Sequence, residues 1–277
     1  MKELQFKELC EVCDNFLLES NLSESRVSIS WLHILKFHPI FLKEYKHLFY
    51  EKDSFKRIRS FLQLIYFSSI TAYRIVKGLY SKRIYSSKNI NNMSSDILII
   101  SHLENIELLN KKNDFYFGDI PNKLREFGMT STVALINHIS VNKYSLPSGW
   151  LDSENNHILI NNSISFFDEL KIYLAQIKES ISLRKIKPQS NLVDRIANEA
   201  AIQVFSPTTA NNLRLKKQVS NIIKVIKPKC IMLTYEGHAW ERLLFAEAKK
   251  IDPQIKCIGY QHALINHQYS LYRCLGG

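Results

Sequence analysis

Two short segments late in the chain combine carboxylate, imidazole and glycine in a way that could support proton transfer. They run from Tyr235 to His238 and from Gly259 to His262. A carboxylate such as Glu236 could take a proton from an acceptor hydroxyl, which makes it a candidate general base. Gly237 would allow a tight turn, and the helix that follows would offer backbone N–H groups to an anion. His262 could donate a hydrogen bond to a phosphate or carboxylate, so we predict Glu236 and His262 as the catalytic pair.

Other polar residues follow two earlier hydrophobic runs. His102 and Asn105 come after the first run, and His138 comes after the second. Ligands of an open parallel sheet bind beyond the carboxyl ends of its strands, so these side chains are expected at one edge. Glu241 has a second interpretation as a helix cap, because acids are favoured near a helix N-terminus. The predicted substrate-binding residues are Tyr235, Gly237, His238, Glu241, Gly259, Tyr260, Gln261, His102, Asn105 and His138.

The elements that would carry these residues alternate between short β-branched runs and longer amphipathic segments. Such alternation predicts an α/β fold with a Rossmann-like, doubly wound parallel sheet, joined by right-handed crossovers. The expected strands are residues 96–101, 132–137, 157–161, 230–234 and 256–260. The expected helices are residues 122–127, 167–178, 192–205, 211–226 and 240–250.

The first part of the chain has a different character, with helical spacing and no good strand before about residue 90. A polar stretch from Ser86 to Ser95 is expected to link a helical, basic region (1–90) to a Rossmann-like domain (91–277). Residues 54–88 hold many Lys and Arg residues and no acid. The uncharged run 60–73 within them is shorter than the roughly 20 residues of a spanning helix. It suits a helix lying in a membrane interface, or equally a core helix with solvated ends.

Bulk composition limits the class of partner. The 277 residues are 45% hydrophobic and carry a formal net charge of +11, which favours a globular protein with an anionic partner. The chain begins without a recognisable signal peptide, so we expect a cytoplasmic protein. The Cys10–Cys13 spacing lacks a second ligand pair, and no phosphate-loop, dinucleotide or zinc-helix motif is present. No metal, no cofactor and no nucleic-acid partner is therefore predicted.

The late motifs resemble those of a known family. Residues 235–241 (YEGHAWE), followed by residues 258–263 (IGYQHA), resemble bacterial surface carbohydrate biosynthesis proteins, which look like GT-B-type glycosyltransferases of capsule and lipopolysaccharide assembly. The family pattern is Tyr-Glu-Gly-Gln-Pro-Trp-Glu followed by Gly-Tyr-Gln-His, from which His238 and Ala239 depart. The resemblance covers roughly residues 96–273, with motif support from Thr234 onward.

The resemblance implies transfer of a sugar from a nucleotide-sugar donor to a glycan or lipid-linked acceptor. GT-B enzymes use two Rossmann-like halves, so this chain is expected to hold the N-terminal half without the second. The basic helix would place the protein on the inner face of the cytoplasmic membrane, beside anionic lipid. Two alternatives remain open: a non-catalytic, membrane-associated module that binds a glycan or nucleotide, and a nucleotide-sugar epimerase.

Overall fold

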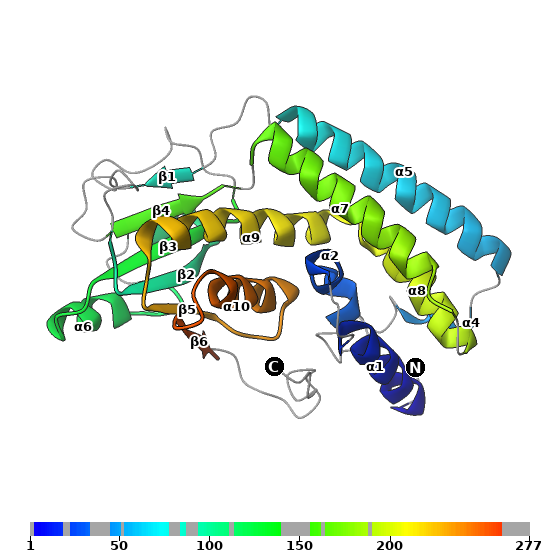
Figure 1. The fold of residues 1–277 in the computed structure, drawn as a ribbon, viewed down its shortest axis with the longest axis horizontal. Helices are drawn as coiled ribbons and strands as arrows, with labels where there is room; N and C mark the ends of the chain where they lie inside the picture. The colour runs from blue at the N-terminus through cyan, green and yellow to red at the C-terminus, as the bar shows by residue number, and fades with distance from the viewer. Residues whose placement is uncertain are drawn as a thin grey trace.

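The fold was obtained as a computed structural model, which describes residues 3–18, 23–33, 45–50, 53–77, 84–86, 94–110, 114–139, 156–161, 164–187 and 190–261. Figure 1 shows two groups of elements, a sheet flanked by helices and a cluster of helices beside it. In chain order the strands are β1 (Ile84–Ser86), β2 (Ile97–Leu103), β3 (Ser131–Asn137), β4 (Asn156–Ile160), β5 (Cys230–Thr234) and β6 (Lys256–Tyr260). The longer helices are α1 (Glu3–Leu18), α5 (Asp53–Lys77), α7 (Phe166–Arg184), α8 (Asn191–Gln203), α9 (Pro207–Ile226) and α10 (Ala239–Ile251).

The sheet has the strand order β1-β4-β3-β2-β5-β6. Strands β2 to β6 are all parallel, whereas β1 pairs antiparallel with β4 at the edge. The chain builds outward from β2 through β3 to β4, then returns to the other side of β2 to form β5 and β6. The direction of winding therefore changes between β2 and β5, which is the position where open α/β sheets bind their ligands.

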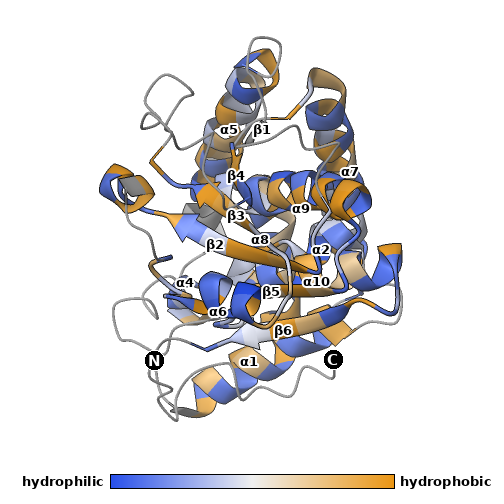
Figure 2. Ribbon diagram, turned by 90° about the vertical axis from the view of Figure 1, so that its left-hand side faces the viewer, coloured by the Kyte–Doolittle hydropathy of each residue, from blue (hydrophilic) through white to orange (hydrophobic). Residues whose placement is uncertain are grey.

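Both faces of the sheet are covered, which explains why its strands read as continuous hydrophobic runs. On one face, Leu98, Ile100 and their neighbours pack against α9 and α10. On the other, Ile99 and Val133 pack against Phe117 and the short helix α6 (Ile120–Glu126). Figure 2 shows the hydrophobic residues along these strands. The covering helices hold the strand ends in register and so fix the loops that follow them.

The helical cluster has a core of its own. Residues of α1, α5, α7 and α8 contribute, together with the short helix α4 (His47–Tyr50) and the 3-10 helix Ser30–His33. Cys13 is buried in this core, where it packs as a small apolar residue. Serine side chains cap α7, α8 and α9: Ser165 accepts from Asp168 N, Ser190 from Val193 N and Ser206 from Thr209 N.

Buried ion pairs cross between these helices. The guanidinium of Arg214 on α9 donates to both carboxylate oxygens of Glu169 on α7, at 2.6 and 2.7 Å. Arg26, in the short helix α2 (Glu24–Val27), donates from Nε to Glu179 of α7 at 2.6 Å. Each of these four side chains is at most 6% exposed. The acids of α7 are thus turned inward and neutralised by partners on other helices.

The structure confirms an α/β protein with a parallel sheet preceded by helices, and the five expected strands match β2 to β6 closely. One expectation is wrong, because β1 is a strand before residue 90. It has only three residues, too few to show the alternation that marks a strand in a sequence. Among the described residues, no helix is long and apolar enough to cross a membrane.

Candidate functional site

The polar residues that follow β2, β3 and β5 meet at the carboxyl edge of the sheet. His102 lies at the end of β2, His138 directly follows β3, and Thr234 is the last residue of β5. Because β2 pairs with both β3 and β5, the three side chains stand side by side at the position where the winding changes direction. We take this cluster as the candidate functional site.

His102 is the centre of the cluster. Its Nδ1 lies 2.9 Å from Nε2 of His138, and its Nε2 lies 3.0 Å from Oγ1 of Thr234. The two imidazoles stack with centroids 5.1 Å apart. The rings of Tyr116 and Trp240 meet His102 edge-on, at 5.2 and 5.4 Å. Both nitrogens of His102 are therefore engaged, and aromatic rings fix the plane of its ring.

Burial controls the charge of this pair. Partial desolvation of His138 lowers the pKa of its imidazole, against a smaller opposing effect of the Glu104 carboxylate. A hydrogen bond between two imidazoles needs one nitrogen without a proton, so both rings cannot be fully protonated together. The pair can hold one positive charge at most, and the site can pass a proton between neighbouring groups.

The loop after β5 places an acid–imidazole pair nearby. Gly237 has φ 85°, a conformation that side-chain-bearing residues rarely adopt, which explains the glycine at this turn. The turn brings Nε2 of His238 to 3.3 Å from Oε2 of Glu236. Both side chains are about one third exposed, so a ligand can reach them. The predicted general base thus lies at the open side of the cluster with an imidazole as partner.

Glu241 is oriented toward the protein rather than toward solvent. It is fully buried, and its carboxylate accepts hydrogen bonds from the backbone N–H groups of Glu236 and His238, at 2.7 to 3.0 Å. Burial raises its pKa to about 7 despite these donors. The backbone donors of the loop before α10, at Glu236 and His238, are therefore occupied by the protein's own acid. Glu241 holds the loop, as its interpretation as a helix cap expected, and does not face a substrate.

A turn that the sequence did not single out adds Tyr116 to the cluster. Oδ1 of Asp114 accepts from Ser101 Oγ and from the N–H groups of Tyr116 and Phe117. The turn closes at Gly118, with φ 55°, and its Asp-to-Gly spacing was a signal for a tight turn. Tyr116 donates to Glu104 at 2.6 Å. Burial and the nearby carboxylates raise the pKa of its hydroxyl, so Tyr116 acts as a donor rather than as a base.

Gly259 and Tyr260, from the second predicted motif, pack beside the residues that build the site. An added Cβ at Gly259 would lie 2.8 Å from Cβ of Tyr235, so the two strands approach as closely as only glycine allows. Tyr235 stacks on Phe245 of α10 and contributes to packing. The ring of Tyr260 lies 5.3 Å from that of Phe117, beside the turn that carries Tyr116.

The other predicted residues are Asn105, Gln261 and His262. Asn105 is exposed, and its side chain accepts from Glu107 N at the start of the 3-10 helix Ile106–Asn110, which makes it a helix cap. Gln261 is the last described residue, directly after β6. His262 lies outside the described residues, so its catalytic role stays a prediction.

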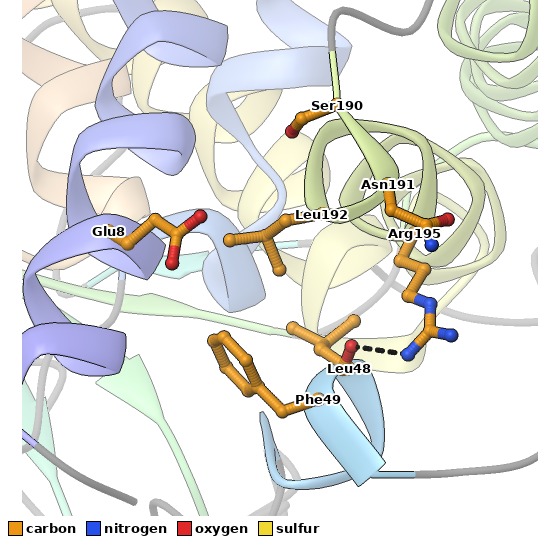
Figure 3. A pocket seen from close by; sticks show the side chains of 7 residues that line it. All are labelled: Glu8, Leu48, Phe49, Ser190, Asn191, Leu192 and Arg195. Carbon is orange, nitrogen blue, oxygen red and sulfur yellow. Dashed lines mark hydrogen bonds between the residues drawn. The ribbon is translucent and has the colours of Figure 1, made fainter.

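A separate pocket of about 350 Å³ lies in the helical cluster, among α1, α4 and α8 (Figure 3). Two of its polar side chains already serve the fold: Arg195 donates to Leu48 O at 2.8 Å, and Ser190 caps α8. Across the described part of the chain, no group of three His, Cys, Asp or Glu side chains could hold a metal ion. The sheet edge is therefore the better candidate for chemistry.

The fold and the edge together define an α/β protein with a candidate ligand site at the point where its parallel sheet changes winding direction. No family model, curated protein or solved structure matches the chain.

Proposed function

We propose that the chain is a glycosyltransferase-like protein of bacterial surface polysaccharide synthesis, built on a Rossmann-like half of the GT-B type. In this role the carboxyl edge of β2 and β5 binds a sugar and its acceptor, and Glu236 is the general base. The observation that carries the proposal is the position of Glu236, which is partly exposed, 3.3 Å from His238 and on the loop next to His102. The motif resemblance of residues 235–241 and 258–263 supports it.

The proposed step is a displacement at the anomeric carbon of a nucleotide sugar. The acceptor hydroxyl oxygen forms a bond to that carbon, and the bond from the carbon to the phosphate oxygen breaks. The nucleoside diphosphate leaves with the electron pair, while the hydroxyl proton passes to the Glu236 carboxylate. His238 can then relay that proton, because its ring already contacts Glu236. No step needs an oxidant or a reductant.

The other groups of the cluster suit the sugar and its leaving group. Ligand sites combine aromatic walls with a few fixed polar groups, and here the rings of Tyr116 and Trp240 stand around His102. The His102–His138 pair can carry one positive charge beside the leaving phosphate and so offset its negative charge. The raised pKa of Tyr116 disfavours an epimerase that would use this tyrosine as its base.

The test is transfer of a labelled sugar by the purified chain, with a panel of nucleotide sugars and lipid-linked acceptors. Glu236→Gln should lower turnover by about a hundredfold or more, because it removes the base. Glu126→Gln is the matched control, since Glu126 is an exposed carboxylate at the end of α6. Equal turnover by the wild type and Glu236→Gln would remove Glu236 from the mechanism.

A second candidate function is recognition of a glycan or nucleotide without catalysis. It is favoured by Glu241, which occupies the backbone N–H groups of Glu236 and His238 in the loop before α10, so that a diphosphate cannot use these donors. Saturable binding of a nucleotide sugar without transfer to any acceptor would support this candidate over the enzyme.

A further inference from the structure

Helix α5 has an apolar surface on the side that faces away from the protein core. The inner side carries Phe67 and Thr71, which are 8% and 6% exposed. On the outer side, apolar residues recur at three- and four-residue intervals, and their side chains are 49% to 66% exposed. These large outer residues are Ile58, Phe61, Leu62, Ile65, Tyr66, Tyr73 and Val76. A helix on the surface of a soluble domain normally has a polar outer face, so this face indicates a partner.

The polar content of this outer face is small. From Ile58 to Val76 its other exposed positions are Ser69 and Ala72. The hydroxyl of Ser69 donates to the backbone oxygen of Ile65 at 2.9 Å, so it is satisfied without water. A side chain bonded in this way can enter an apolar medium at low cost. The outer face of α5 can therefore leave water as a unit.

Helix α7 packs beside α5, and the C-terminal end of α5 lies near the N-terminal end of α7 (Figure 1). The outer face of α7 alternates apolar and basic side chains. Its exposed residues include Phe167, Leu170, Leu174 and Ile181, together with Lys171, Lys178, Arg184 and its C-cap Lys185.

The acids of α7 are absent from that outer face. Glu169 and Glu179 are buried against Arg214 and Arg26, and Asp168 is partly buried and 3.6 Å from Lys217. Segregation of acids inward and bases outward leaves an apolar surface edged by positive charge. This is the pattern of a helix that lies in a membrane interface, where Lys and Arg meet anionic headgroups.

We infer that the outer faces of α5 and α7 form one docking surface for an anionic lipid bilayer. The 25 residues of α5 give a helix about 37 Å long, which lies along the bilayer with its apolar side chains among the lipid headgroups and acyl chains. The basic side chains of α7 bind the phosphates beside it. The inference rests on the two helix faces and is independent of the reaction proposed for the sheet edge.

The test is flotation of the full chain with vesicles of phosphatidylcholine alone, and with vesicles that contain about 30 mol % phosphatidylglycerol. We expect at least about tenfold stronger binding to the anionic vesicles, falling as salt is added. The double variant Phe61→Gln, Ile65→Gln should lower that binding about tenfold or more. The matched control is Phe127→Gln, which removes a side chain that is 78% exposed at the end of α6.

Two double variants test the contribution of the basic side chains of α7. Lys171→Gln with Lys178→Gln should weaken binding to anionic vesicles and flatten its salt dependence, while Lys123→Gln with Lys224→Gln, at exposed positions on α6 and α9, should not. Circular dichroism of each variant confirms that the fold is kept. Equal binding to both vesicle types would overturn the inference. A dimer in sedimentation velocity that the Phe61→Gln, Ile65→Gln variant dissociates would also overturn it. The outer face of α5 would then bind a second copy of the chain.

Discussion

The Nδ1 of His102 lies 2.9 Å from the Nε2 of His138, so one imidazole must donate a hydrogen bond to the other, and the bonded pair cannot carry two positive charges. This relationship joins the ends of β2 and β3, and through Thr234 it reaches β5. The position of a proton on one of these side chains therefore affects the hydrogen bonds at the ends of all three strands.

The first prediction concerns pH. Partial desolvation lowers the pKa of His138 in the folded protein, so the unfolded chain takes up this proton first as the pH falls. The stability that His138 contributes is therefore present above its unfolded pKa of about 6.5 and is lost as the pH falls toward the folded pKa. Urea unfolding from pH 7.5 to 5 should show this slope, and His138→Gln should reduce it. An unchanged slope in that variant would contradict the assignment of this pH dependence to His138.

Glu241 should produce a slope of the opposite sign. Its pKa is raised from 4.5 to about 7, so the folded protein binds the proton more tightly than the unfolded chain. Its contribution to stability is complete below pH 4.5 and is lost as the pH rises through 7, by up to about 3 kcal/mol. Glu241→Gln should remove that dependence, as read from thermal melting across this range. The prediction would be contradicted if the melting temperature of the wild type rose with pH across this range and that of Glu241→Gln did not. The fold would then stabilise the carboxylate form of Glu241.

Gly259 should not tolerate even one added methyl group. Its Cβ would lie 2.8 Å from Cβ of Tyr235, which cannot rotate away because it is the first atom of its side chain. Gly259→Ala should lower the free energy of unfolding by about 1–3 kcal/mol. It should also weaken ligand binding, since Tyr235 leads directly into the loop of Glu236. Urea denaturation gives the first quantity, and full wild-type stability would show that β6 can shift at little cost.

The pair of Glu169 and Arg214 should be costly to break. Both side chains are 3% exposed, and removing one charge leaves the other buried without a counter-charge. Glu169→Gln should lower the free energy of unfolding by about 3–5 kcal/mol. The double variant Glu169→Leu, Arg214→Met should recover most of that loss, because it leaves no buried charge. A single-variant cost below about 1 kcal/mol would mean that water reaches the pair.

The sequence was sufficient for the parallel strands because burial on both faces makes them continuous hydrophobic runs, as in residues 96–101. It also located the loops of Glu236 and His102 at one edge, since parallel strands end together. It could not reveal β1, which pairs only with a distant strand, or Tyr116, which reaches His102 through a turn built by Asp114. It could not decide between the two interpretations of Glu241, because the direction of a side chain depends on which backbone donors the folded loop presents.

The central claim is that the edge formed by β2 and β5 binds a nucleotide sugar. Its most direct test is titration calorimetry of the full chain against a panel of nucleotide sugars, with His102→Ala and the control Glu126→Gln. We predict saturable binding of at least one nucleotide sugar, weakened about tenfold or more by His102→Ala and unchanged by the control. Absence of binding across the panel, or binding that is equally strong without the His102 imidazole, would contradict the account.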